Sequence, residues 1–414
     1  MKFDFLYFIG LILALLAELM NSIVPVHTPE LADVFFLLYM MSVAKMKFNR
    51  AYVLWMLSVF AFFALSMAWS INTWNCYWAM RQFFVMSIGI LATYNYLKSS
   101  PGNIKKLLKV YLVVSLFLIV FVLMHIDQIE SGTRLGQQVD ESLGEEGALN
   151  SNLIAINLCY ALYAGFVLFF QGKKSKLVKV AVLGASAFVV YLILLTGSRK
   201  AIILLLLPFI IQPLLNKNIG KKLLLIPIAA GVAALGFYLI MYVPILYEAI
   251  GVRFEDAINI VTGSTVGGED ISRAMLIEYG IEWFKERPAL GYGINCFRVL
   301  SDKTWMFGGK NFFAHNNYVE LLVDVGVIGT LIYYSCYFYL WKKLKGHFVD
   351  NPLNKWVAIL IVVQLFLDFA MVSYYSFNSN LILCLCFFAA EKTQNIKVKN
   401  TVIKHEASRH YQTV

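Results

Sequence analysis

Three short polar stretches in a strongly apolar chain carry the side chains that could perform chemistry. They are Thr196-Gly-Ser-Arg-Lys200, the outer-segment arginines Arg253 and Arg273, and His315-Asn-Asn-Tyr-Val-Glu320. Arginine can clamp a phosphate through two hydrogen bonds, whereas lysine acts as a point charge. Histidine can take a proton from a hydroxyl as that oxygen attacks. Together these residue types predict transfer from a phosphate-bearing substrate, with the arginines stabilising the charge on the leaving pyrophosphate.

Each of these stretches also has a purely structural interpretation. Arg199 and Lys200 could extend to lipid headgroups, Arg253 and Arg273 could be solvated loop charges, and His315 could be an interfacial side chain. A cationic pair held against two apolar helices is costly, however, which favours a functional role for Arg199.

The histidine stretch also predicts local structure. Asn317-Tyr-Val-Glu320 fits a capping box, which would make Asn317 the helix cap and place His315 just before the helix, beside a water-filled cleft. The outward-facing helix amides would then favour a phosphate. Asn317, Glu320 and Asp324 form one polar stripe, which could equally be a seam inside the bundle, and Glu320 could orient His315 or brace the bundle. Gly326 and Gly329 are predicted to let this helix pack closely.

Several other kinds of site have no signature in the sequence. No carboxylate pair at a recognisable spacing, Walker loop or metal-ligand cluster occurs, so neither a metal nor a cofactor is expected. The six cysteines lie mostly in apolar runs and lack metal-binding spacing. A disulfide between Cys76 and Cys296 on the outer side remains an open alternative.

The composition indicates how these side chains are positioned. Of 414 residues, 60% are hydrophobic and 14% charged, and the mean hydropathy is +0.69. Several apolar runs reach about twenty residues, the length of a membrane-spanning helix, and they lack the alternation of a transmembrane barrel. The sequence therefore predicts an all-α polytopic membrane protein surrounded by lipid. The net charge of +10 is attributed to cytoplasmic lysine clusters and not to a nucleic-acid partner.

The lysine clusters alternate with the apolar runs and predict both termini in the cytoplasm. About twelve spans are expected, at residues 5–24, 31–44, 51–69, 81–97, 108–126, 151–170, 178–196, 201–215, 223–243, 318–340, 356–372 and 379–390. The predicted organisation is nine spans in 1–243, a large extracytoplasmic segment in 244–317, three spans in 318–390 and a basic cytoplasmic tail in 391–414. Within the large segment, one helix is expected from Asp270 or Ser272 to Arg287 and a weaker one from Ile245 to Val261.

Three sequence stretches in this order resemble the bacterial O-antigen ligase and O-antigen polymerase superfamily. Gly147-Ala-Leu-Asn-Ser-Asn152 opens the sixth span, Thr196-Gly-Ser-Arg199 ends the seventh, and His315-Asn-Asn-Tyr-Val-Glu320 with Gly326-Val-Ile-Gly329 follows the large segment. The run from Arg273 to Gly293 fits as well, and the resemblance is strongest from Gly147 to Gly329.

The resemblance implies a metal-independent glycosyltransferase with a GT-C-like fold, working on the outer side of the bacterial inner membrane. It implies an undecaprenyl-pyrophosphate-linked glycan donor and a sugar acceptor. The implied catalytic residues are His315, Arg199 and Arg273, and the substrate-binding candidates are Asn152, Ser198, Lys200, Arg253, Asn316, Asn317 and Glu320.

Polymerisation of surface polysaccharide repeat units is the favoured activity. Ligation to lipid A–core stands second, and glycosylation of a protein hydroxyl stays open. A polysaccharide flippase is a more distant alternative, which predicts two related halves that the sequence does not show.

Overall fold

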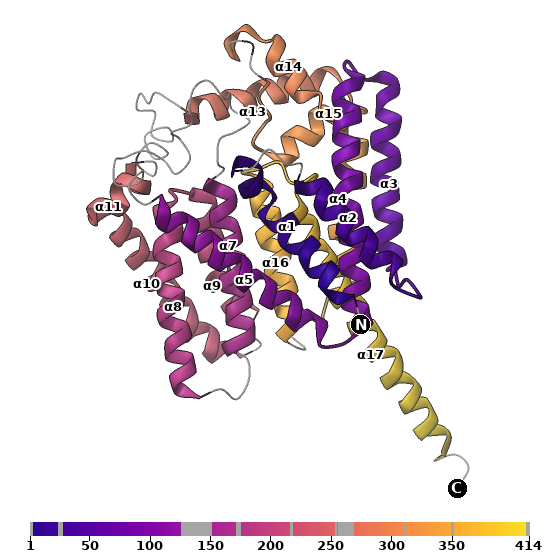
Figure 1. The fold of residues 1–414 in the computed structure, drawn as a ribbon, viewed down its shortest axis with the longest axis vertical. Coiled ribbons are helices and arrows are strands. Elements are labelled where there is room, and N and C mark those ends of the chain that lie inside the picture. Colours follow the sequence, from indigo (N-terminus) through magenta and orange to yellow (C-terminus); the bar gives the residue numbers. More distant parts are fainter. Residues whose placement is uncertain are drawn as a thin grey trace. The chain divides into compact units, whose positions relative to one another are not determined.

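The computed structural model describes residues 3–23, 28–125, 151–170, 175–215, 218–252, 255, 269–307, 309, 311–348 and 352–410. Its regular elements are all helices, and no strand occurs in this described part (Figure 1). Five of its helices are long and apolar enough to cross a membrane: residues Asn103–Met124, Ser151–Phe169, Lys176–Leu195, Lys222–Tyr242 and Asn317–Leu344. Shorter apolar helices cover Asp4–Ala17, Arg50–Ser66 and Leu353–Leu367. These findings agree with a polytopic membrane protein, while the number of twelve spans and the sides of the termini stay predictions.

The chain divides into two compact units. The first unit comprises Met1–Met46, Val85–Leu214 and Asn218–Tyr279, and the second comprises Lys47–Phe84, Leu215–Lys217 and Gly280–Val414. Arg199 and Arg273 belong to the first unit, and His315 belongs to the second. Each unit is therefore described separately.

The first unit is a bundle of apolar helices. Its helices are α1 (Asp4–Ile23), α2 (Thr28–Met41), α5 (Asn103–Met124), α7 (Ser151–Phe170), α8 (Lys176–Leu195), α9 (Arg199–Leu214), α10 (Ile219–Tyr242), α11 (Pro244–Leu246) and η3 (Tyr247–Gly251). It also contains the second part of α4 (Thr73–Ser99) and the first part of α13 (Glu269–Glu286). The helix predicted at residues 151–170 is confirmed from its first residue to its last as α7.

Helix α9 contains a proline whose effect on the backbone is compensated by α7. Pro208 lacks an N–H group, so the carbonyl four residues earlier, at Leu204, loses its helical partner. The Tyr163 hydroxyl of α7 donates to that carbonyl, and the Cys159 thiol donates to the Ala201 carbonyl at 3.6 Å. These contacts join α7 to α9 close to the end of α9 that carries Arg199.

The second unit holds the histidine stretch. Its helices are α3 (Arg50–Ser66), η1 (Met67–Trp69), α14 (Phe297–Lys303), η4 (Trp305–Phe307), α15 (Asn317–Leu344), α16 (Pro352–Leu367) and α17 (Phe377–His410). Helix α3 packs on α15, where the Trp55 indole donates to the Tyr333 carbonyl at 2.9 Å. A Cβ atom at Gly329 would lie only 2.7 Å from the Phe62 ring of α3, so the predicted close packing at Gly329 is confirmed.

Several predicted helix boundaries are wrong, and three of the differences have a clear physical reason. The helix expected from residue 81 begins at Thr73, because the Asn72 side chain accepts hydrogen bonds from the amides of Trp74 (3.0 Å) and Asn75 (3.1 Å). Helix α16 ends at Leu367 and not at Val372, since Asp368 begins a buried polar connection. Helix α17 continues past Ala390 to His410, through a segment containing many lysines and other good helix formers.

Helix α13 lies close to its predicted position. It begins at Glu269, before both of the predicted cap residues, and ends at Glu286, just before Pro288. Of the weaker helix expected from Ile245 to Val261, the described residues form α11 and the short helix η3. Arg253 and residues 127–150 lie outside the described part of the chain.

Candidate functional site

The N-terminus of α15 is capped one residue earlier than predicted. Asn316, not Asn317, has the extended backbone of a cap, and its side chain accepts hydrogen bonds from the amides of Tyr318 (3.0 Å) and Val319 (3.2 Å). The capping-box pattern pointed to Asn317, because only that asparagine is followed three residues later by a glutamate, Glu320. The observed cap uses the Asn316 side chain without such a glutamate. His315 therefore lies directly before the cap residue.

Asn317 is the first residue of α15 and is fully buried. Its side-chain oxygen accepts from the amides of Ser373 (2.9 Å) and Tyr374 (3.2 Å), and its side-chain nitrogen donates to the Tyr334 hydroxyl at 2.9 Å. Tyr334 in turn donates to the Asp368 carboxylate at 2.8 Å. This network fixes the start of α15 to the connection between α16 and α17, and a direct contact of Asn317 with substrate stays a prediction.

Glu320 holds the turn that carries His315. One oxygen of its fully buried carboxylate accepts a 2.6 Å hydrogen bond from the backbone amide of Ala314. The next residue, His315, has a left-handed backbone with φ of 52°, which is uncommon for any residue except glycine. Such strain persists only where the surroundings enforce it, and it is concentrated at functional positions. Of the two roles predicted for Glu320, the geometry favours orienting His315 through the backbone.

Arg298 is a neighbour of His315 that the sequence analysis missed. Its guanidinium lies 5.1 Å from the ring centre of Phe313, and that ring lies 4.0 Å from the imidazole of His315. Burial lowers the pKa of Arg298, but the nearby Tyr375 and Glu320 raise it, and the net change is upward, so the side chain stays cationic. Among the described residues, Nε of Arg298 and Oε1 of Glu320 are buried without hydrogen-bond partners.

Gly326 lets α15 pack closely, as predicted, but against the segment after α13, since a Cβ atom there would lie 2.3 Å from the Ala289 carbonyl oxygen. It breaks α15, with φ of 64° and ψ of −170°, a conformation that is essentially restricted to glycine. Beyond the break, the Val327 amide donates to the Pro288 carbonyl (2.8 Å) and the Ile328 amide donates to the Ala289 carbonyl (3.3 Å). The segment after α13 therefore supplies acceptors for the amides that the break removes from the helix.

The same segment also supplies donors. The Val323 carbonyl accepts from the Tyr292 amide at 3.0 Å, and the Asp324 carbonyl accepts from the Gly293 amide at 2.8 Å. The fully buried carboxylate of Asp324 then accepts from the amides of Asn295 and Phe297, both at 2.7 Å, at the start of α14. The predicted polar stripe of α15 is therefore a buried seam, in which Glu320 and Asp324 tie the helix to the segment preceding His315 and Asn317 ties it to the connection between α16 and α17.

The first unit gathers a second set of predicted residues where α8 ends and α9 begins. Gly197, with φ of 67°, ends α8 in the left-handed conformation common at helix C-termini. The Ser198 hydroxyl donates to the side-chain oxygen of Asn152 at 2.9 Å and accepts from the Ala201 amide at 3.4 Å. Arg199 and Lys200 follow, both half-buried, in the first turn of α9. Two cations at the positive end of a helix favour a bound anion.

Arg273 lies on α13 and is half-buried. In the described part of the chain, no three His, Cys, Asp or Glu side chains gather as metal ligands would. Independence from metal remains a prediction.

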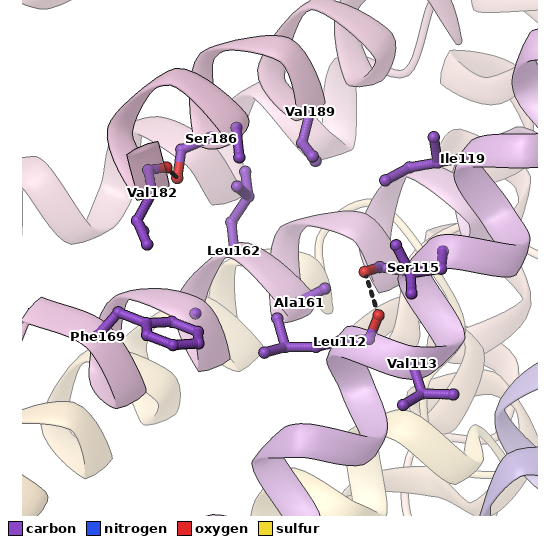
Figure 2. Close-up of a pocket in the computed structure, with 13 residues that line it drawn as sticks. Leu112, Val113, Ser115, Ile119, Ala161, Leu162, Phe169, Val182, Ser186 and Val189 are labelled. Carbon is purple, nitrogen blue, oxygen red and sulfur yellow. Dashed lines mark hydrogen bonds between the residues drawn. The ribbon is translucent and has the colours of Figure 1, made fainter. Parts of the chain in front are cut away.

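An apolar groove of about 290 Å³ lies between α5, α7 and α8 in the first unit (Figure 2). The hydroxyl protons of its two serines are already engaged, because Ser115 donates to the Leu112 carbonyl and Ser186 donates to the Val182 carbonyl, both at 2.7 Å. The groove therefore suits a hydrocarbon. Its lining is Leu112, Val113, Ser115, Leu116, Ile119, Ala161, Leu162, Gly165, Phe169, Val182, Ala185, Ser186 and Val189.

One comparison with known protein families covers both the residues around His315 and those around Arg199. A family model described as O-antigen ligase matches residues 184–334, a range that includes Arg199, Arg273 and His315. No curated protein matches the chain. The family supports glycan transfer of the O-antigen ligase or polymerase type. This match supports placing the chain among the membrane proteins of the O-antigen ligase and O-antigen polymerase superfamily.

Proposed function

We propose that this protein transfers an oligosaccharide from an undecaprenyl-pyrophosphate donor to a sugar hydroxyl on the outer face of the bacterial inner membrane. The acceptor in this proposal is a second lipid-linked repeat unit, so the product is a growing surface polysaccharide. The observation that carries the proposal is the strained His315, held between the Glu320-bound turn and the Asn316 cap, within the range that matches the O-antigen ligase family.

In the proposed reaction, His315 assists removal of the proton from the acceptor hydroxyl as its oxygen attacks the anomeric carbon. The bond from that carbon to the pyrophosphate oxygen breaks, and Arg199 and Arg273 stabilise the negative charge that develops on the leaving group. A direct displacement of this kind inverts the anomeric centre. His315, Arg199 and Arg273 are the proposed catalytic residues.

We assign substrate-binding roles to residues that lie near the proposed catalytic residues. Asn152 and Ser198 hold the turn that presents Arg199, and Lys200 adds a second positive charge beside it. Arg253 is proposed to bind the donor from the large outer segment. Asn316, Asn317 and Glu320 shape the surroundings of His315, where the acceptor sugar is proposed to bind.

Transfer to lipid A–core is the second candidate, because the matching family model is described as O-antigen ligase. The two activities share the donor and differ only in the acceptor. Purified protein with a defined lipid-linked repeat unit, supplied with and without lipid A–core, separates them. We expect extended repeat-unit chains in the absence of lipid A–core. Product that forms only when lipid A–core is added would assign the ligase activity, and no product with either acceptor would contradict glycan transfer.

The apolar groove is proposed to hold part of the polyprenyl chain of the donor. Two of its three walls, α7 and α8, end beside the Asn152, Ser198 and Arg199 group. On α7 the groove lies ten to eighteen positions beyond Ser151, about 15–27 Å along the helix. Half a bilayer core is only about 15 Å deep. A chain that starts from a pyrophosphate at Arg199 must therefore be long to fill the groove, as a polyprenyl chain is.

Replacing Gly165 by leucine should weaken use of a long-chain donor. A Cβ atom at Gly165 would contact only Leu112, at an ordinary 3.6 Å, so the new side chain fits and fills the groove. The leucine would displace part of the donor's prenyl chain from the groove. A loss of about two buried methylene groups of that chain corresponds to a rise of about tenfold in KM for the donor. Steady-state kinetics with long and short prenyl donors test this, and the short donor should show no change.

The matched control is Gly184→Leu on α8. A Cβ atom there would meet no atom within 4 Å, and Gly184 does not line the groove. Both variants gain helix propensity from leucine. Equal KM values for the two variants with the long donor would remove the groove from the proposal.

A further inference from the structure

The thiols of Cys76 and Cys296 lie together in the second unit, where the start of α4 meets the segment before α14. Both residues are fully buried. The Ser70 hydroxyl contacts both sulfurs, Cys76 Sγ at 3.0 Å and Cys296 Sγ at 3.3 Å. Two cysteines 220 positions apart therefore meet at one point.

The backbone on either side fixes this arrangement. The Ile71 amide donates to the Tyr292 carbonyl at 3.1 Å. The side-chain nitrogens of Asn75 and Asn295 each donate to the other residue's carbonyl, at 3.3 and 3.4 Å. These hydrogen bonds hold the start of α4 and the segment before α14 in a fixed alignment next to the two thiols. A bond between the sulfurs is therefore compatible with the fold.

The segment that carries Cys296 also supports the α15 break. Gly293 and Asn295 donate to Asp324 through their amides. Gly293 has φ of 102°, and a Cβ atom there would lie 2.5 Å from Ser70 Oγ. The thiol pair therefore joins the start of α4 to the same segment that braces the helix following His315.

We propose that Cys76 and Cys296 form a disulfide bond in the mature protein, and that this bond fastens the 291–296 segment to the start of α4. The predicted topology places both residues on the outer side of the membrane, where disulfides form and persist. The bond would close a long loop, the arrangement in which a cross-link restricts the unfolded chain most.

The oxidant is a protein disulfide carried by a thiol–disulfide oxidoreductase. Exchange begins when one of the two cysteines, written here as Cys76, is deprotonated, because the thiolate and not the thiol is the nucleophile. Cys76 attacks one sulfur of the oxidant and forms a mixed disulfide. Cys296 then displaces the oxidant. Two S–H bonds are lost, one S–S bond forms, two protons leave, and two electrons reduce the oxidant to its dithiol.

Because both sulfurs are buried in the folded protein, exchange takes place while the 291–296 segment is still undocked. The full-length protein, isolated without reductant and denatured in an alkylating agent, tests the proposal by peptide mapping. We expect a cross-linked peptide pair containing Cys76 and Cys296, which is lost on reduction before alkylation. Recovery of both residues as alkylated free thiols in the unreduced sample would overturn the proposal.

A single variant and a matched control complete the test. In Cys76→Ser the cross-linked pair should be absent and Cys296 should be alkylated without reduction. In Cys159→Ser, which alters a buried cysteine of α7 in the first unit, the pair should remain. Reductant should lower the melting temperature of the unmodified protein and leave that of Cys76→Ser unchanged. A cross-link from Cys296 to another cysteine in the unmodified protein would also contradict the assignment.

Discussion

Replacing His315 by alanine is expected to lower the rate of glycan transfer by about 10²–10⁴-fold, the range that general acid–base catalysis contributes. The reason is chemical, because alanine cannot accept the proton of the attacking hydroxyl. The measurement is formation of extended glycan by purified protein from a defined lipid-linked repeat unit. Full activity of His315→Ala would remove His315 from the mechanism.

The backbone at His315 complicates interpretation of the alanine variant. With φ of 52°, alanine is strained, and loss of activity could follow from a displaced turn. His315→Asn separates the two effects, since asparagine tolerates the left-handed region and has no imidazole. We expect His315→Asn to be as inactive as His315→Ala while keeping the melting temperature of the unmodified protein. An active asparagine variant would assign His315 a conformational role in place of a catalytic one.

The long apolar helices were predictable from the sequence because their signals are local. Helix α7 was predicted at its observed bounds, since a polar segment precedes a mostly apolar run of twenty residues. The lysine clusters and Pro288 similarly marked helix ends. The family, too, was recognisable from short motifs in a fixed order, and the match over residues 184–334 confirms it.

Features that depend on distant partners were not predictable in the same way. Arg298 is one arginine among several charged residues of the outer segment, and only the folded chain brings it beside Phe313 and Glu320. One signal was present in the sequence, because Arg298 lies between the apolar residues Phe297 and Val299. The cap position was mispredicted for a different reason, since the sequence pattern fits Asn317 with Glu320, whereas in the structure Glu320 bonds to the Ala314 amide and Asn316 caps the helix.

The break at Gly326 had a visible but incomplete signal. A glycine in an apolar run is consistent with close packing, with a kink, or with neither. The kink is explained only by the folded chain, in which the backbone of residues 288–293 provides both hydrogen-bond donors and acceptors for the interrupted helix. That pairing joins positions more than thirty residues apart, which no helical periodicity encodes.

Replacing Gly326 by alanine is expected to cause the largest loss of stability of any single substitution proposed for this chain. A Cβ atom would lie 2.3 Å from the carbonyl oxygen of Ala289 and 2.5 Å from the amide nitrogen of Leu290. Both are backbone atoms and cannot rotate away. The φ of 64° adds strain of about 1–3 kcal/mol, and displacing the segment would break the hydrogen bonds from Val327 and Ile328 to Pro288 and Ala289.

Gly346→Ala provides the control for backbone strain alone. Gly346 also has a positive φ, of 81°, but a Cβ atom there would meet nothing within 4 Å. Its cost should therefore be limited to the left-handed conformation, about 1–2 kcal/mol, whereas Gly326→Ala should cost several kcal/mol more because buried backbone groups lose their partners as well. Thermal unfolding in detergent compares the two variants. Equal melting temperatures would show that the segment before α14 moves away without cost, and would contradict the proposal that it braces the helix that follows His315.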